Sequence, residues 1–208
     1  MSKAGSSTDA FRVMLLGNGG VGKTCITLKF TYDEFEEPYN PSRHDLYSKN
    51  VEKDGKTYTI LIVDTAGQES YARITDVQIR ESDYFLLIFA LNNLESFNYC
   101  KELRDYVQRL KEPEGPVRMA LVGNKVDLVQ ANPKTREVTK AQAVALAEQW
   151  NVRFNHIKIP YVETSAKANI NINEIFMSAL DEILKHTVAT ETKEKPKKVK
   201  KKGLCSIL

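Results

Sequence analysis

The chain has 208 residues, of which 42% are hydrophobic, and a formal net charge of +3. This is enough apolar sequence for one well-buried domain and too little for two. Residues 191–202 contain seven Lys and two Glu, a local charge of +5, so the remaining residues carry −2. The basic residues gather in a tail and do not spread over a folded face, which disfavours a nucleic-acid-binding role.

Four apolar runs alternate with segments long enough for helices, at residues 11–17, 60–64, 84–91 and 117–123. This alternation predicts an α/β fold with a mostly parallel sheet covered on both faces. The three cysteines, Cys25, Cys100 and Cys205, lie far apart and fit no zinc-binding spacing, which indicates a reducing compartment. No segment resembles a signal peptide or a membrane-spanning run.

Residues 1–10 are small and polar, and we expect them to be disordered. The next run, Phe11 to Leu16, predicts a buried strand that leads into GNGGVGKT, residues 17–24. This octapeptide fits the phosphate-loop pattern, in which backbone N–H groups surround phosphate oxygens, a lysine adds charge and a hydroxyl binds Mg²⁺. Residues 25–32 predict a helix whose positive end faces the same phosphates. The cradle would consist of Gly17, Asn18, Gly19, Gly20, Val21, Gly22, Lys23, Thr24 and Cys25.

Residues 33–45, DEFEEPYNPSRHD, are polar and contain two prolines, which predicts a surface loop beside the phosphate site. Ser42 is a candidate second hydroxyl for Mg²⁺, although by itself a serine after Pro41 is more simply a turn residue. Asp54-Gly55 then predicts a hairpin between strands at 46–53 and 56–63, with the first strand antiparallel at a sheet edge.

The inner strand of this hairpin ends at Asp64, where DTAGQE occupies residues 64–69. Parallel sheets bind ligands at the carboxyl ends of their strands, so Asp64 is a candidate for holding the water shell of a metal. Gly67 frees the backbone to turn toward a terminal phosphate. Gln68 can both donate to and accept from a water, which suits it to orienting a nucleophile, whereas an isolated exposed glutamine is usually just solvated.

Residues 84–91 predict a central strand, and residues 94–111 predict an amphipathic helix with a core-facing stripe. A strand at 117–123 then leads into NKVDL, residues 124–128. Asp127 can accept two hydrogen bonds from the N1–H and the exocyclic amine of guanine, while Asn124 can pair with the N7 side of a purine. Adenine lacks this donor pair. A plain strand-to-helix turn is the competing interpretation of so short a motif.

The rest of the folded region is predicted as a polar loop at 129–138, a helix at 140–150 capped by Thr139, a short strand at 161–164 and a long final helix capped by Asn171 with Glu174. Residues 151–159 are left as a loop excursion or an extension of a neighbouring element. The chain ends Cys205-Ser206-Ile207-Leu208, which fits a C-a-a-X prenylation pattern whose final Leu favours geranylgeranyl. The preceding lysines would add attraction to an anionic membrane, and a merely solvated tail is the alternative.

With GNGGVGKT, DTAGQE, NKVDL, TSAK and CSIL in this order, the chain resembles the small GTPases of the Ras family from about residue 11 to its C-terminus. GKTC also occurs in Rho-type relatives, but residues 64–93 look more Ras-like and no Rho-type inserted helix is visible. The resemblance implies a P-loop NTPase three-layer sandwich with a six-stranded, mostly parallel sheet, one antiparallel edge strand and about five helices. Residues 11–187 would form this domain, and residues 188–208 a polybasic tail.

The resemblance also implies GDP and GTP as ligands, with Mg²⁺ bound by Thr24 and Ser42 and with Asp64 behind a metal-bound water. Gln68 would position the attacking water and Lys23 would be the second catalytic residue. Asn124 and Asp127 would recognise guanine, and the N–H of Ala166 would reach the base oxygen. The remaining residues of the pocket would be Phe35 at the family's ring-packing position, Ser165, and the lysines Lys125 and Lys167, packed on the base or ribose.

The implied partners are a guanine-nucleotide exchange factor, a GTPase-activating protein and effectors that contact residues 33–47 and 65–80. The resemblance further implies a monomer in solution, no nucleic-acid partner, and attachment through prenylated Cys205 to the cytoplasmic face of a membrane, with the plasma membrane expected.

The first mobile loop departs from the family pattern: where many relatives read YDPTIEDSY, this chain reads YNPSRHDLY at residues 39–47. Ser42 lacks the methyl group of threonine, so we expect a GTP-bound loop that spends more time open. Asn40, Arg43 and His44 replace acidic and apolar groups, so basic Ras-binding domains should dock poorly. Arg43 follows the presumed metal ligand, which argues against a built-in arginine finger and predicts slow hydrolysis without an activating protein.

Two other functions remain open on the sequence alone. The altered loop could belong to a scaffold that holds nucleotide with little turnover, which single-turnover GTP hydrolysis would distinguish. An adenine-nucleotide kinase or ATPase is disfavoured by NKVDL and TSAK, and competition between ATP and labelled GDP would test it.

Overall fold

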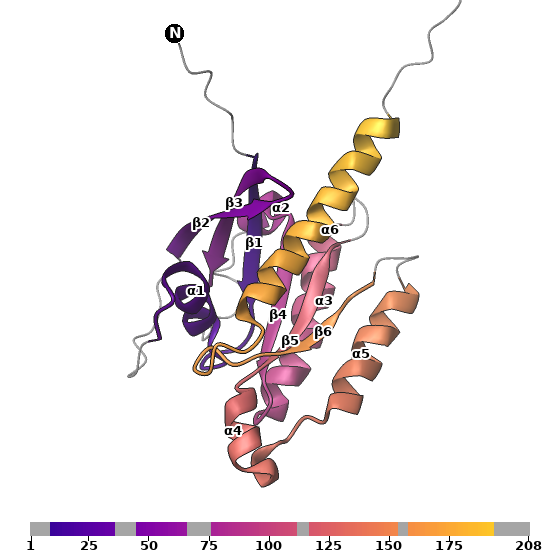
Figure 1. Cartoon of the computed structure of the whole chain (residues 1–208). Helices are drawn as coiled ribbons and strands as arrows, with labels where there is room; N and C mark the ends of the chain where they lie inside the picture. The colour runs from indigo at the N-terminus through magenta and orange to yellow at the C-terminus, as the bar shows by residue number, and fades with distance from the viewer. Residues whose placement is uncertain (1–8, 36–44, 66–75, 112–116, 154–157, 194–208) are drawn as a thin grey trace, which may run out of the picture.

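The computed structural model describes residues 9–35, 45–65, 76–111, 117–153 and 158–193, and the side chains of these residues except 45, 152, 153 and 187–193. Its centre is a six-stranded sheet (Figure 1). The parallel strands are β1 (Asp9–Leu16), β3 (Lys56–Asp64), β4 (Tyr84–Ala90), β5 (Met119–Asn124) and β6 (Tyr161–Glu163). Strand β2 (Asp45–Lys53) lies antiparallel to β3 at one edge, in the order β2-β3-β1-β4-β5-β6, which confirms the predicted architecture.

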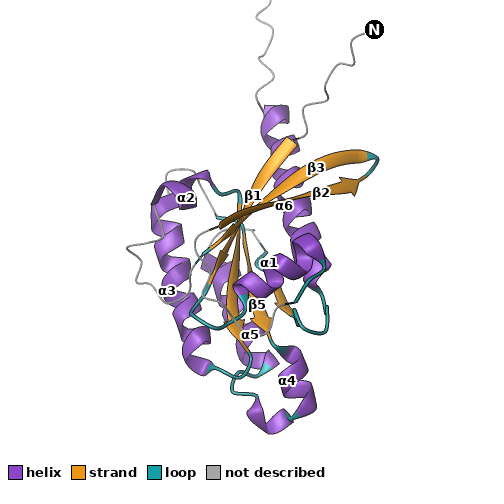
Figure 2. Cartoon of the chain, turned by 90° about the vertical axis from the view of Figure 1, so that its left-hand side faces the viewer, coloured by secondary structure: helices purple, strands orange, loops and turns teal. Residues whose placement is uncertain are grey.

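Helices cover both faces of this sheet (Figure 2). They are α1 (Lys23–Tyr32), α2 (Asp76–Glu81), α3 (Leu94–Lys111), α4 (Val126–Ala131), α5 (Lys140–Arg153) and α6 (Ile172–Lys193), with a short 3₁₀ turn, η3 (Pro133–Thr135). Side chains of α1 and α6 pack on one face, against Val13 and Leu15. Side chains of α2, α3, α4 and α5 pack on the other, against Met14 and Leu16. Alternate residues of β1 thus enter opposite cores, as expected for a strand buried on both faces.

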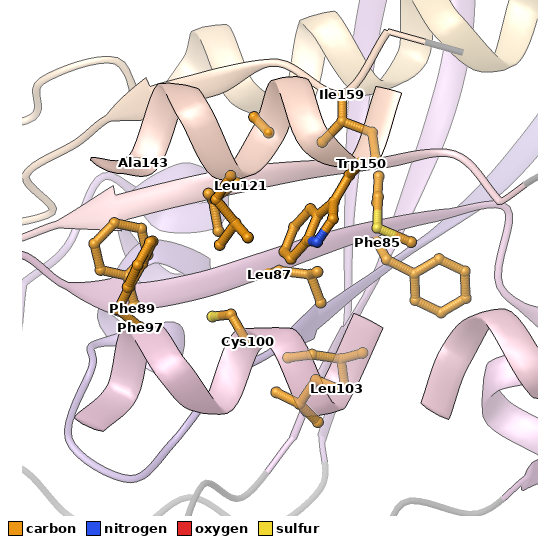
Figure 3. Close-up of a cluster of buried hydrophobic side chains, with 14 of the residues drawn as sticks. Phe85, Leu87, Phe89, Phe97, Cys100, Leu103, Leu121, Ala143, Trp150 and Ile159 are labelled. Atoms are coloured by element: carbon orange, nitrogen blue, oxygen red, sulfur yellow. The ribbon is translucent and has the colours of Figure 1, made fainter. Parts of the chain in front are cut away.

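The core between α3, α5 and the sheet is rich in aromatic side chains (Figure 3). Phe89 and Phe97 meet edge to face with their ring centroids 4.9 Å apart. Trp150 from α5 is 4% exposed, and Cys100 from α3 is fully buried. The apolar stripe predicted for residues 94–111 faces this core, with Leu103 and Val107 buried on it.

Three details differ from the sequence-based prediction. Residues 126–131 fold as α4, inside the region predicted as a motif and a polar loop, so that the described residues form six α-helices where about five were expected. Strand β1 begins at Asp9, so residues 9 and 10 pair with β3 and are not disordered. Asn171 has a left-handed φ of +57°, and its side-chain amide donates to the carbonyl of Glu163 at 2.8 Å. The Asn171 carbonyl accepts from the Ile175 N–H at 3.3 Å at the start of α6, but its backbone is not the extended one typical of a side-chain cap and its side chain is used on Glu163, so Asn171 does not form the predicted capping box.

Helix α5 shows the predicted cap and a longer reach than predicted. The hydroxyl of Thr139 accepts from the Gln142 N–H at 3.2 Å, while the Gln142 side chain accepts from the Thr139 N–H at 2.8 Å. The helix continues to Arg153, so part of the unassigned segment 151–159 extends α5. The end of this segment lies beside its beginning, because the Ile159 N–H donates to Asn151 Oδ1 at 2.5 Å. Among the helices of the described ranges, none combines the length and apolar character needed to cross a bilayer.

Candidate functional site

The phosphate-loop sequence connects the end of β1 to the start of α1, and two of its glycines pack too closely against neighbours for any side chain. A Cβ atom at Gly17 would lie 2.1 Å from the carbonyl oxygen of Ile88 in β4. A Cβ atom at Gly22 would lie 2.5 Å from the side-chain nitrogen of Asn124, and Gly22 has a φ of +97°. The loop therefore needs glycine here to reach the ends of β4 and β5.

Lys23 is held at the centre of this loop. It is 5% exposed, and its ammonium donates to the carbonyls of Gly17 at 2.9 Å and Asn18 at 3.0 Å. Burial lowers the pKa of Lys23 from 10.5 to about 8, an effect that the charge of Asp64 partly offsets. An anion placed beside this ammonium would favour its charged form and raise the pKa again. The side chain of Asn18 also accepts from the Gly19 N–H at 2.7 Å, which tightens the turn.

A hydroxyl and a carboxylate meet beside the start of α1. Thr24 donates through Oγ1 to Oδ2 of Asp64 at 2.7 Å. Asp64 is fully buried at the carboxyl end of β3, where the next residue, Thr65, donates through its hydroxyl to the Leu15 carbonyl at 2.8 Å. Both groups are hard oxygen donors of the kind that Mg²⁺ takes in proteins, so the residues present fit a magnesium ion.

The carboxyl ends of β5 and β6 bring the second group of predicted residues together. Asn124 is 2% exposed, donates through its side chain to the Val21 carbonyl at 2.8 Å and accepts from the Thr164 hydroxyl at 3.2 Å. The Ser165 hydroxyl donates to Oδ1 of Asp127 at 2.6 Å. Asn124 thus joins the phosphate loop to the segments that contain Asp127 and Ser165.

One cavity of about 320 Å³ lies between these two groups. Its size falls within the range of small-ligand sites in proteins. Nearly all of its walls come from residues that the sequence analysis singled out, the exception being Leu128; the lining is Gly20, Gly22, Cys25, Phe35, Asn124, Lys125, Asp127, Leu128, Ala166 and Lys167. The structure therefore brings the phosphate loop and the NKVD and SAK segments to one cavity.

Some predicted site residues lie outside the described residues: Ser42, Gly67, Gln68 and Cys205. The predictions made for them, and for the open first loop and its partners, stay predictions. Sequence reasoning gave no role to Thr164, which is fully buried and donates to Asn124. Its place directly before Ser165 in TSAK was the available signal, but a contact across 40 residues cannot be inferred from spacing.

Comparison with known proteins agrees with this geometry. The model of the Ras family matches residues 12–185. Ras-related protein ralB-A of Xenopus laevis and Ras-related protein O-RAL of Diplobatis ommata are each 41% identical to this chain over 182 residues, 88% of this chain and 83% of theirs. Ras-related protein Ral-B of Rattus norvegicus is 41% identical over 181 residues, 87% of this chain and 82% of its own. The chain therefore belongs to the Ras family and is a GTPase.

Proposed function

We propose that this GTP-binding switch works with Mg²⁺, hydrolyses GTP slowly until a GTPase-activating protein assists, and is anchored to the cytoplasmic face of a membrane, with the plasma membrane as its expected site. The observation that supports nucleotide binding most directly is the single cavity whose walls contain both Gly22 of the phosphate loop and Asp127 of NKVD. A purine nucleotide has an anionic polyphosphate at one end, which would face the phosphate loop, and a base edge at the other, which would face Asp127. Residues 11–187 would be the switch domain, preceded by the first two residues of β1, Asp9 and Ala10.

Phosphate and metal would be held at the α1 end of the cavity. The ammonium of Lys23, which is 5% exposed, would balance phosphate charge. The Thr24 hydroxyl would bind Mg²⁺ together with Ser42. Asp64 would hold a metal-bound water from the buried end of β3. Magnesium would supply charge stabilisation at the phosphates, and Gln68 would orient the attacking water. Gly67 would let the chain carrying Gln68 approach the terminal phosphate.

The base would be read at the β5–β6 end. Asp127 would accept from the N1–H and exocyclic amine of guanine, held in orientation by its 2.6 Å contact with the Ser165 hydroxyl. The N–H of Ala166 would face the base oxygen. Phe35, Lys125 and Lys167 line the cavity and would pack on the ribose or base.

Substitution of Asp127 tests this assignment. A carboxamide at this position can donate where guanine also donates, so Asp127→Asn should weaken GDP binding at least ~100-fold, because a site built to pair one base edge rejects a mismatched one strongly. The same variant should gain affinity for xanthosine diphosphate, which offers an acceptor there. Labelled-nucleotide competition measures both. Equal GDP affinity in wild type and Asp127→Asn would contradict the assignment.

Membrane attachment would come from two weak signals that add: a prenyl group on Cys205 and the Lys-rich segment 191–202. In cells, Cys205→Ser should move the protein from the membrane to the soluble fraction. Replacing lysines 197, 198, 200, 201 and 202 by glutamine should weaken attachment in proportion to the charge removed. A Cys205→Ser variant that stays membrane-bound would contradict anchoring through this cysteine.

A further inference from the structure

Arg136, Tyr161 and Glu163 form a polar cluster at β6, directly before the TSAK segment, and none of the three lines the cavity. The guanidinium of Arg136 donates two parallel hydrogen bonds to the carboxylate of Glu163, at 2.9 and 2.8 Å. The hydroxyl of Tyr161 donates to the same carboxylate at 2.9 Å. The side chains of Arg136 and Glu163 are 25% and 19% exposed. Paired bonds of this kind fix the mutual orientation of their partners, in addition to attracting them.

Arg136 is attached to a rigid part of the domain. The next two residues, Glu137 and Val138, donate their N–H groups to the Leu91 carbonyl at 3.0 and 3.1 Å. The Glu137 carboxylate accepts from the Leu94 N–H at 2.8 Å at the start of α3, and Val138 is fully buried. Arg136 therefore reaches Glu163 from a platform formed by the end of β4 and the start of α3.

Glu163 is the last residue of β6 and immediately precedes the loop proposed to contact guanine. Thr164 donates its N–H to the Gly123 carbonyl at 2.8 Å, and its own carbonyl accepts from Val126 at 3.0 Å. Its hydroxyl bonds to Asn124, and the neighbouring Ser165 hydroxyl bonds to Asp127. A shift of Glu163 would thus be transmitted within two residues to both side chains that would read the base.

The hydrogen bond between Arg136 and Glu163 also completes a closed circuit of contacts between two segments of the chain. Residues 124–127 lead through α4 and η3 to Arg136, Arg136 bonds to Glu163, and Thr164 and Ser165 return to Asn124 and Asp127. The two segments that line the base end of the cavity are therefore joined at both ends. Arg136 holds the pKa of Glu163 below its ordinary value, mainly through these hydrogen bonds, so the carboxylate stays charged at neutral pH.

We propose that Glu163 and Arg136 are positioning residues for guanine recognition: by fixing the loop after β6 against the segment after β5, they set how slowly the nucleotide dissociates and how strictly guanine is selected. This inference rests on the proposed function of the cavity. Neither residue lines the cavity, so the effect acts through Thr164 and Ser165.

The test uses the full chain loaded with a fluorescent GDP in excess Mg²⁺, and compares Glu163→Ala and Glu163→Gln with wild type. Loss of the oriented contact should speed GDP dissociation about tenfold in Glu163→Ala, in line with the loss of one charge-assisted hydrogen-bond pair. Glu163→Gln keeps one acceptor oxygen and should give an intermediate rate. The preference for GDP over inosine diphosphate, which lacks the exocyclic amine, should fall at least about threefold in Glu163→Ala because Asp127 is no longer held in register.

Asp181→Ala provides a matched control. It removes another partly exposed ion pair, Lys53–Asp181 at 2.6 Å between β2 and α6, whose side chains are 27% and 39% exposed. This variant should lower the unfolding midpoint without changing GDP dissociation or base preference. Glu163 variants that match wild type in both nucleotide measurements, or change them no more than Asp181→Ala does, would overturn the inference while leaving GDP binding intact. Failure of wild type to bind GDP would instead reject the proposed function, and this inference with it.

Discussion

At the scale of single residues, the site depends on how closely backbones approach one another. Gly22 lies against Asn124, whose side chain is buried and held at both ends by Val21 and Thr164. Because Asn124 cannot move away without breaking these bonds, a methyl group at residue 22 would disrupt the join between the phosphate loop and the base-binding segments. The absence of a side chain at residue 22 therefore allows the phosphate loop and the base-binding segments to pack together.

Gly22→Ala should reduce GDP affinity about 100-fold, the cost of losing roughly two buried hydrogen bonds. Gly55→Ala is the matched control, since Gly55 also has a left-handed backbone, with φ +74°, but no atom lies within 4 Å of its hypothetical Cβ. The control should lose ~1–2 kcal/mol of stability from backbone strain alone and bind GDP normally. Calorimetric titration with GDP and urea unfolding measure the two effects. Equal GDP affinity in both variants would refute the explanation.

The buried thiol of Cys100 predicts a specific pH dependence of stability. Burial raises its pKa from 9.0 to about 12. Between these values the unfolded thiol loses its proton and the folded thiol keeps it, so unfolding releases a proton and stability falls as pH rises, by up to about 1.4 kcal/mol per pH unit. This pH dependence of stability is absent well below pH 9, where the thiol is protonated in both the folded and the unfolded state.

The measurement is the difference in urea-unfolding free energy between pH 8 and pH 10.5, taken for wild type and for Cys100→Ala. The alanine variant lacks this titration, so its stability should fall less over the same interval, even though it begins lower because of the cavity it creates. Tyrosine titrations and those of the other lysines contribute to both proteins and cancel in the comparison, whereas Lys23, which is electrostatically coupled to Cys100, is part of the measured difference. Identical pH slopes would show that the thiol ionises in the folded state as easily as in the unfolded one.

At the scale of elements, α5 packs on the sheet through four buried side chains, of which Trp150 is the largest; the others are Ala143, Leu146 and Ala147. Trp150 is buried in the core of Figure 3, and the Arg104 guanidinium of α3 lies 5.7 Å from its ring centroid. Trp150 is also the only tryptophan in the sequence, so its fluorescence reports directly on this packing.

Trp150→Ala should cost about 3–5 kcal/mol of unfolding free energy, whereas Trp150→Phe should cost clearly less because an aromatic ring is retained. Chemical denaturation followed by circular dichroism checks both values. Since Trp150 does not line the cavity, GDP dissociation from the folded variants should match wild type. A Trp150→Ala variant as stable as wild type would mean that α5 is held by other contacts.

Elements with a strong local signal could be predicted from the sequence, and those defined by tertiary contacts could not. The apolar run at 84–91 and the Asp54-Gly55 turn gave β4 and the β2–β3 hairpin with ends correct to within a residue or two. Helix α4 has six residues, too few for a helical period to appear, and was missed. Asn171 has a left-handed backbone and directs its side chain to the Glu163 carbonyl, a tertiary contact that its cap-like sequence does not indicate.

The same division applies to the site. The meeting of Asn124 and Asp127 with the phosphate loop could be predicted, because the carboxyl ends of parallel strands share one edge of the sheet. The Arg136–Glu163 pair spans 27 residues and depends on how η3 returns to β4, which no local pattern encodes. The low pKa of Lys23 likewise comes from burial by surrounding elements and not from its sequence neighbours.

At the scale of the whole molecule, the fold places the C-terminal end of α6 far from the proposed nucleotide site. Helix α6 begins beside the loop after β6 and runs 22 residues, ~33 Å, past the sheet to the end where β1 starts (Figures 1 and 2). A membrane anchor at the end of the chain would therefore hold the domain by the end remote from the cavity. Exchange factors and effectors could then reach the nucleotide from the cytoplasm while the protein stays attached.

The central claim is that one cavity holds a guanine nucleotide with its phosphates on a magnesium ion. The most direct measurement is to purify the full chain without added nucleotide, identify what co-purifies, and follow its release when EDTA removes the metal. We predict close to one GDP or GTP per protein, retained in Mg²⁺ and released at least ~10-fold faster in EDTA, since Thr24 would hold the metal and the metal would supply charge stabilisation at the phosphates. A protein that purifies empty and does not take up GDP in Mg²⁺, or that binds ATP equally well, would contradict the account.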